Sequence, residues 1–268
     1  MDLKFQPAIA AIKADDVDTL RALVAEDPSL ATSRSSISHP TLLQCLVLDG
    51  KDKPHACEMA QVLIEAGAEI NAPLVAAAGI DNRALAEFLL DRGAAIDGTG
   101  DWSPLEEALY WNSRNVIALL LERGAKIQNL RMAAALGRLE LIEMYFNADG
   151  SLKPEAGKIS WPFGGARKSW PQDQLSIINN AFVYACMHGH IEAAKLLLEK
   201  GAEINAIPDG FDYAGTALHY AALNGQRAMV EFLLAHGADR NLKDTKVGST
   251  AAGWAEYGGH SELLELLR

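Results

Sequence analysis

One five-residue phrase recurs along this chain of 268 residues and constrains its fold more than any other feature. Each copy begins with Gly-Ala and follows a leucine-rich stretch of helical periodicity. The copies read Gly67-Ala68-Glu69-Ile70-Asn71, Gly93-Ala94-Ala95-Ile96-Asp97, Gly124-Ala125-Lys126-Ile127-Gln128, Gly201-Ala202-Glu203-Ile204-Asn205 and Gly237-Ala238-Asp239-Arg240-Asn241. Adjacent copies lie roughly 26 to 36 residues apart, or about two such periods apart before the fourth copy. A repeat of this length predicts a solenoid, in which each unit buries its apolar face against its neighbours.

The clearest copy of the whole repeat lies near the C-terminus. It runs Thr216-Ala217-Leu218-His219-Tyr220-Ala221-Ala222-Leu223-Asn224-Gly225 and continues as Met229-Val230-Glu231-Phe232-Leu233-Leu234-Ala235-His236-Gly237-Ala238-Asp239. This segment resembles the ankyrin repeat, whose pattern reads T-P-L-H-x-A-A-x-x-G-H-x-x-x-V-x-x-L-L-x-x-G-A-D. Thr216 can cap the first helix, and Gly225 permits the sharp turn between the helices. Leu233 and Leu234 are expected to be almost fully buried between repeats, as is Leu197 one repeat earlier.

Aligned on that copy, the pattern covers nearly the whole chain. It predicts an all-α ankyrin-repeat solenoid of about eight helix-turn-helix units with one long insertion, forming a single array over residues 1–268. The predicted repeats span about residues 4–33, 38–71, 72–98, 99–129, 130–150, 177–207, 208–241 and 242–268, with the insertion at 147–176. First helices are expected at about residues 41–48, 74–79, 104–111, 131–136, 179–187, 217–223 and 251–257. Turns between paired helices are expected at Gly50, Gly137, Gly189, Gly225 and Gly259.

Charge and cysteine content narrow the classes of function. The formal net charge of −11 argues against nucleic acid as the main partner, because affinity for a phosphate backbone comes largely from Lys and Arg. The three cysteines are odd in number and show no metal-ligand spacing, so they are expected to be reduced thiols in a cytoplasmic protein. The N-terminus lacks a basic region followed by an apolar run, and no apolar stretch is long enough to span a bilayer. No membrane partner is therefore expected.

The helical periodicity breaks at the predicted insertion, residues 147–176. Structureless loops of this length inside compact proteins are uncommon, and they are either functional or disordered. This one combines aromatic residues with a local excess of basic ones, and its candidate contact residues are Trp161, Arg167, Lys168 and Trp170. Two interpretations stay open. The aromatic residues pack the insertion onto the array, or they form a basic and aromatic lip that contacts a ligand or partner.

The resemblance also implies which residues of the array face a partner. In ankyrin arrays the hairpin tips and the two residues before the turn glycine vary and face the concave surface. At these positions the candidate partner-binding residues are Trp102, Tyr110, Trp111, Leu136, His188 and Tyr257. The first three belong to one repeat, and Trp and Tyr dominate binding hot spots. Packing beneath the insertion stays the alternative for these three aromatic residues.

The remaining chemistry-bearing residues show no catalytic or metal-binding constellation. The resemblance implies that His219 hydrogen-bonds the neighbouring hairpin and that His190 belongs to a turn, which leaves His188 without a definable set of metal ligands. Glu106 and Glu107 are adjacent at a helix start, where acidic residues favourably meet the helix dipole, and adjacent helical residues do not share a face. We expect no catalytic residue, no metal and no cofactor.

The sequence therefore predicts a monomeric, non-enzymatic module that binds another protein, of unknown identity, through its concave groove. The alternative is a small-molecule binder or an enzyme whose pocket is roofed by the insertion. In that alternative Trp161 and Trp170 form the walls, and the polar groups are His188, Arg167 or Glu106.

Overall fold

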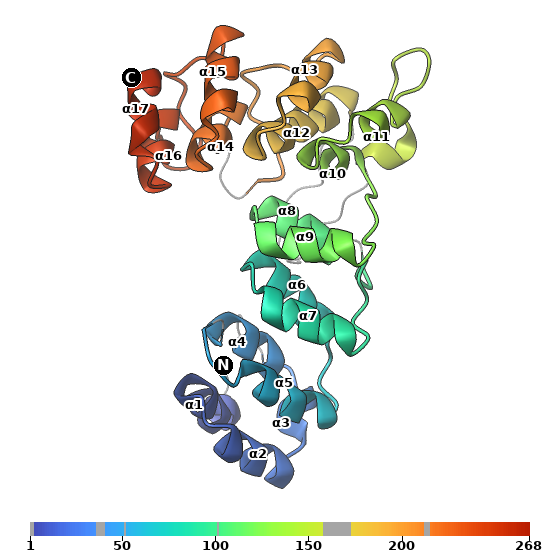
Figure 1. The fold of residues 1–268 in the computed structure, drawn as a ribbon, viewed down its shortest axis with the longest axis vertical. Helices are drawn as coiled ribbons and strands as arrows, with labels where there is room; N and C mark the ends of the chain where they lie inside the picture. The colour runs from blue at the N-terminus through green and yellow to red at the C-terminus, as the bar shows by residue number, and fades with distance from the viewer. Residues whose placement is uncertain (1–2, 36–40, 51, 101, 158–172, 212–214) are drawn as a thin grey trace. The chain divides into compact units, whose positions relative to one another are not determined.

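The computed structural model describes residues 3–35, 41–50, 52–100, 102–157, 173–211 and 215–268 (Figure 1). Within these ranges the regular secondary structure is helical, beside two isolated bridges that pair Phe146 with Leu152 and Lys243 with Thr250. The prediction of an all-helical chain is confirmed. Contacts gather the chain into two compact units, Met1–Lys126 and Ile127–Arg268, which are described in turn. The single continuous array stays a prediction.

Successive helix pairs build the first unit (Figure 1). Its described helices are η1 (Leu3–Phe5), α1 (Gln6–Ala14), α2 (Val17–Glu26), α3 (Ser29–Thr32), α4 (Leu42–Asp49), α5 (Ala56–Glu65), α6 (Asn71–Gly79), α7 (Arg83–Asp91), α8 (Pro104–Tyr110) and α9 (Arg114–Glu122). We call the first helix of each pair its inner helix (α1, α4, α6, α8) and the second its outer helix (α2, α5, α7, α9). Inner helices pack on inner helices and outer helices on outer helices, as expected where each repeat contacts its neighbours.

The second unit repeats this plan. Its described helices are α10 (Leu130–Ala135), α11 (Leu139–Met144), η2 (Pro154–Gly157), α12 (Gln174–Met187), α13 (Ile191–Glu199), α14 (Ala217–Leu223), α15 (Arg227–Ala235), α16 (Ala251–Tyr257), η3 (Ser261–Leu263) and α17 (Leu264–Leu267). The inner helices here are α10, α12, α14 and α16. Helix α12 begins at Gln174 rather than near residue 179, because the Asp173 side chain accepts the backbone N–H of Ser176 at 2.9 Å and caps the helix earlier.

The turns between paired helices use two kinds of residue. In the second unit the left-handed position falls on Gly137, Gly189, Gly225 and Gly259, at the predicted turns. In the first unit it falls on Asp15, Asp81 and Asn112, with φ of 59°, 57° and 54°. Gly50 also separates paired helices, but its φ of −101° lies outside the left-handed region. Asp and Asn tolerate this conformation better than other residues with a Cβ, and their side chains remain available for bonds to the next repeat.

The recurring phrase joins neighbouring repeats through its last residue. In three steps of the array the side-chain oxygen of that residue accepts the backbone N–H of the third phrase residue in the following repeat. These bonds join Asn71 to Ala95, Asp97 to Lys126 and Asn205 to Asp239, at 2.8, 2.8 and 2.9 Å. The phrase therefore recurs because an Asn or Asp at its end satisfies a backbone donor one repeat away.

Leucines of the outer helices fill the core between repeats. Leu197 and Leu233 are fully buried, as predicted, and Thr216 caps α14 together with His219 in a capping box. The prediction that Leu234 is almost fully buried is wrong, since this side chain is only partly buried. Consecutive residues of a helix point about 100° apart, so when Leu233 faces the core Leu234 is turned toward its edge.

Candidate functional site

The strongest candidate surface in the first unit surrounds helix α8. The Ser103 side chain accepts the backbone N–H of Glu106 at 3.1 Å and starts the helix, so Trp102 lies immediately before it. Tyr110 is its last residue and Trp111 follows directly. A helix of only seven residues thus places aromatic side chains at both of its ends. We call Trp102, Glu107, Tyr110 and Trp111 the aromatic cluster.

The carboxylate of Glu107 holds two of these rings. The Trp102 indole Nε1 donates to Glu107 Oε2 at 2.6 Å, and the Trp111 indole Nε1 donates to Glu107 Oε1 at 2.9 Å. Hydrogen bonds to a charged acceptor are shorter and stronger than bonds between neutral groups. Both indoles are therefore fixed in orientation by one side chain, which is itself only 4% exposed.

Edge-on ring contacts complete the cluster. The centroids of Tyr110 and Trp111 lie 5.0 Å apart with an interplanar angle of 80°, and those of Trp102 and Tyr110 lie 6.4 Å apart at 67°. Such T-shaped pairs contribute about 0.5–1.5 kcal/mol beyond the area that they bury. Trp102 and Tyr110 are 5% and 8% exposed, whereas Trp111 is 47% exposed. The cluster thus presents one held indole to solvent above two buried aromatic residues.

A glycine on the preceding inner helix allows this arrangement. Gly79 ends α6, and a Cβ at this position would lie 2.7 Å from Glu107 Oε1 and 3.3 Å from the Trp111 ring. Any larger residue would push against the carboxylate that holds the two indoles. Gly79 of the neighbouring repeat therefore leaves the space that Glu107 and Trp111 occupy.

Sequence reasoning missed the role of Glu107. The predicted role of Glu106 and Glu107 is an interaction of helix-start acids with the helix dipole, but the structure buries both side chains. The pairing of Glu107 with Trp111 was visible in principle, because residues four apart lie on one helix face. The bond from Trp102 to Glu107 could not be predicted from helix spacing, because Trp102 lies before the helix and its position depends on the path of the chain ahead of Ser103.

The second unit places three predicted contact residues at equivalent points. Leu136 and His188 directly follow α10 and α12, and Tyr257 is the last residue of α16. Tyr257 is 88% exposed, and the other two are partly buried. All three lie at the C-terminal end of an inner helix, where Leu136 and His188 match Trp111 of the first unit and Tyr257 matches Tyr110. Within the insertion, Trp161, Arg167, Lys168 and Trp170 lie outside the described residues, so both the lip and the roofed pocket stay predictions.

The histidines of the second unit have packing roles. Nδ1 of His219 lies 2.8 Å from the Thr216 hydroxyl, and its Nε2 lies 3.2 Å from the carbonyl oxygen of Ser249 on the neighbouring hairpin, as predicted. Burial lowers the pKa of His219 and of His190. His190 packs so closely on the turn of the preceding repeat that a Cβ at Gly137 would lie 2.6 Å from its Nδ1. These contacts give His190 and His219 structural roles in the recurring turn pattern.

The thiols are not activated for nucleophilic chemistry. Cys45, Cys57 and Cys186 are free, and burial raises the pKa of each, to about 11 for Cys45. A raised pKa keeps a thiol protonated, whereas a nucleophile needs the thiolate. Among the described residues no group of three His, Cys, Asp or Glu side chains is arranged to hold a metal ion. None of the helices described here has both the length and the apolarity to cross a bilayer.

Comparison with known proteins agrees with this architecture. A family model for ankyrin repeats (3 copies) matches residues 52–131, 130–244 and 183–268. The chain is 30% identical over 223 residues to the ankyrin repeat and KH domain-containing protein mask-1 of Caenorhabditis elegans, which covers 73% of this chain and 8% of that protein. It is 25% identical over 227 residues to the transient receptor potential cation channel subfamily A member 1 of Homo sapiens, covering 78% of this chain and 19% of that protein.

A shorter match is closer in sequence. Over 67 residues the chain is 43% identical to the ankyrin repeat and SOCS box protein 6 of Mus musculus, covering 25% of this chain and 16% of that protein. The chain spans less than a fifth of the length of each of these relatives. The family match covers most of the chain and coincides with the helix pairs and with the phrase that joins them, so the chain belongs to the ankyrin-repeat family.

Proposed function

We propose that this chain binds a partner protein and that the aromatic cluster of the first unit is the anchor of that interaction. Ankyrin repeats generally mediate protein–protein interaction. The cluster supplies a side chain of the kind that dominates binding hot spots, since Trp and Tyr are enriched there. In this proposal Trp111 contacts the partner, while the buried rings of Trp102 and Tyr110 hold the cluster in place.

The exposed indole of Trp111, held by Glu107, is the observation that carries the proposal. When a partner fixes an exposed side chain that was free to rotate, the lost conformational entropy costs about 0.5–1.5 kcal/mol of binding free energy. The 2.9 Å bond to Glu107 and the edge contact with Tyr110 already restrict this ring before binding. A partner can therefore bury about half of an indole with a small loss of side-chain entropy.

Further contacts are proposed at the ends of the inner helices of the second unit. Leu136 and His188 lie at positions equivalent to Trp111 in their own repeats, and Tyr257 lies at the position equivalent to Tyr110. We also propose that Trp161, Arg167, Lys168 and Trp170 contact the partner. The positive charges of Arg167 and Lys168 then favour a partner surface that bears carboxylates or phosphates. Ion pairs of this kind weaken as the salt concentration rises.

The experiment is affinity capture with the intact chain, followed by measurement of the dissociation constant of the captured partner by titration calorimetry. Trp111→Ala is expected to weaken binding about 30-fold, corresponding to the roughly 2 kcal/mol typical of a hot-spot residue. Trp111→Phe tests the tether, because it keeps an aromatic face but loses the bond to Glu107. Met144→Ala is the matched control, since it removes an exposed apolar side chain from outer helix α11.

Circular dichroism establishes that each variant is folded. A partner that binds the wild type, Met144→Ala and Trp111→Ala with equal affinity contradicts the anchor. Equal loss of binding in all three variants would point to non-specific hydrophobic capture instead.

A further inference from the structure

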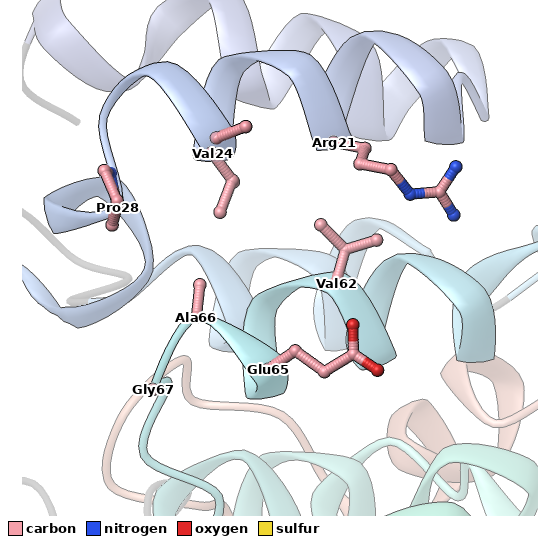
Figure 2. A pocket seen from close by; sticks show the side chains of 8 residues that line it. Arg21, Val24, Pro28, Val62, Glu65, Ala66 and Gly67 are labelled. Carbon is pink, nitrogen blue, oxygen red and sulfur yellow. The ribbon is translucent and has the colours of Figure 1, made fainter.

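A second surface of the first unit lies away from the inner helices, between outer helices α2 and α5. It is an open groove of about 630 Å³, and its lining residues are Arg21, Val24, Ala25, Pro28, Val62, Glu65, Ala66 and Gly67. Figure 2 shows Val24 and Pro28 facing Val62 and Ala66 across the groove, with the charged ends of Arg21 and Glu65 directed toward one end. We call this the α2–α5 groove. Its volume lies in the range of about 300–1,000 Å³ that is typical of binding sites.

The next two steps between outer helices show what fills the corresponding space elsewhere. Arg92 follows α7, lies over the Phe88 ring at 3.3 Å, and donates from Nε to Gln61 Oε1 of α5 at 2.6 Å. Arg123 follows α9 in the same way and donates to Asp91 of α7 at 2.8 Å. In both steps an arginine directly before the Gly-Ala phrase reaches back to the preceding outer helix and covers the space between the two helices.

The α2–α5 step lacks these covering side chains. The residue directly before the phrase glycine is Ala66 in this repeat and Arg92 in the next. The residue five positions before that glycine is Val62 in this repeat and Phe88 in the next. Compared with the next repeat, the α5 wall of the groove therefore lacks an aromatic ring and a guanidinium group. The groove is therefore open because the sequence omits the aromatic and basic pair that fills the next step.

The two segments that supply the lining residues carry an excess of acidic side chains, of which Glu65 lines the groove together with Arg21. Residues 17–32 and 56–69 carry six acidic side chains and one basic side chain. They are Asp18, Glu26, Asp27, Glu58, Glu65 and Glu69, against Arg21. Arg21 is itself paired with Asp18 at 3.1 Å. This surface is complementary to a positively charged segment, whose approach it accelerates and whose orientation it helps to fix.

We propose that the α2–α5 groove is a second docking site, and that its occupant is a helical segment of a partner protein with an aromatic residue followed four residues later by an arginine. The ring fills the space between Val24 and Val62, and the guanidinium reaches Glu65. Residues four apart share one face of a helix, so a single helix presents both groups together, as Phe88 of α7 and Arg92 directly after α7 lie together in this chain.

The test uses a synthetic alanine-based peptide of about 15 residues, the length at which such helices begin to be stable in water. It carries one Phe, an Arg four residues later and a fluorescent label, and its binding to the whole chain is followed by fluorescence anisotropy. Saturable binding that weakens with salt is expected. Peptides with Phe→Ala or Arg→Glu are expected to bind at least about tenfold more weakly.

Two variants of the chain locate the site. Val62→Phe/Ala66→Arg rebuilds the missing pair within the chain and is expected to weaken peptide binding at least about tenfold. Glu65→Lys reverses an exposed charge, removes only an exposed bond from Gln61 and has little effect on folding; it is expected to weaken peptide binding to the same extent, so the test does not depend on whether the double variant folds. In the reverse direction, Phe88→Val/Arg92→Ala opens the next step and is expected to raise the stoichiometry from one peptide to two.

Trp111→Ala separates the two proposals, because it lies outside the groove and is expected to leave peptide binding unchanged. Absence of saturable binding at millimolar peptide would overturn the groove proposal. So would binding that Glu65→Lys leaves intact, or binding that Trp111→Ala abolishes.

Discussion

The hairpin before α16 depends on one buried carboxylate, and its removal is the perturbation with the most direct structural consequence. Asp244 Oδ1 accepts the backbone N–H groups of Lys246 and Val247 at 2.9 and 2.7 Å. Its Oδ2 accepts the N–H of Ser249 at 2.8 Å and the Trp254 indole Nε1 at 3.1 Å. A single side chain thus closes the turn and ties it to the inner helix of the last repeat.

Two substitutions are expected to destabilise the fold to different degrees. Asp244→Asn has one acceptor oxygen, which can keep the bonds to Ser249 and Trp254, while its amide NH₂ faces the N–H groups of Lys246 and Val247. Bonds to charged groups contribute about 1.5–3 kcal/mol each, and water partly replaces them at exposed positions, so we expect a loss of about 2 kcal/mol. Asp244→Ala also removes the bonds from Ser249 and from the buried Trp254 indole, which adds about 1–3 kcal/mol.

The effect has a defined pH dependence. Burial alone would raise the pKa of Asp244, but the bonds from Val247, Trp254, Lys246 and Ser249 outweigh it and lower this pKa to about 2. Because the folded pKa lies below the unfolded value of about 3.9, the stabilisation is fully present above about pH 4. It is lost as the pH falls from about 4 through 2, so the difference between wild type and Asp244→Asn should shrink over that window.

Urea unfolding followed by circular dichroism measures these differences, and hydrogen exchange of α16 shows whether the loss begins in the last repeats, as nearest-neighbour stacking requires. Asp244→Asn within about 0.5 kcal/mol of wild type at pH 7 would refute the reasoning. A difference between the two proteins that stays constant down to pH 2 would refute the assigned role of the charge.

Two further predictions concern the packing of neighbouring repeats. Leu233→Ala should destabilise the chain by about 2–5 kcal/mol in urea unfolding, and Leu234→Ala by distinctly less, because only Leu233 is fully buried; equal losses would contradict this placement. His55 Nδ1 lies 2.8 Å from Asp15 Oδ2, and this bond raises the pKa of His55. Its stabilisation is therefore present below about pH 6.5 and is lost as the pH rises through the raised pKa, so the thermal midpoint of wild type should exceed that of Asp15→Asn in acid and approach it in base.

Most of the fold could be predicted because its signals are local. The spacing of apolar residues and the caps, such as Thr216 of α14, act within a few residues and placed the inner helices close to where they lie. The errors arose where a neighbouring group decides the outcome. The Asp173 side chain caps α12 and starts this helix earlier than predicted. Leu234 is only partly buried because the adjacent Leu233 faces the core.

The candidate site was only partly predictable. The resemblance to the ankyrin pattern placed Trp102, Tyr110 and Trp111 in one repeat, but it did not distinguish the exposed ring from the two buried ones. That distinction depends on Glu107, which binds both indoles, and on Gly79 of the preceding repeat, which leaves room for it. Exposure is a property of packing between repeats and is not encoded in the spacing of aromatic residues.

The sequence by itself determined that the chain is a series of paired helices joined by a recurring phrase, because helix period, caps and turn residues act over short distances along the chain. Only the tertiary structure decided which surfaces remain open. The α2–α5 groove exists because Val24 and Val62, from different repeats, face each other without a covering side chain. Such a space depends on residues far apart in the sequence, and its size is set by how two helices pack rather than by either helix alone.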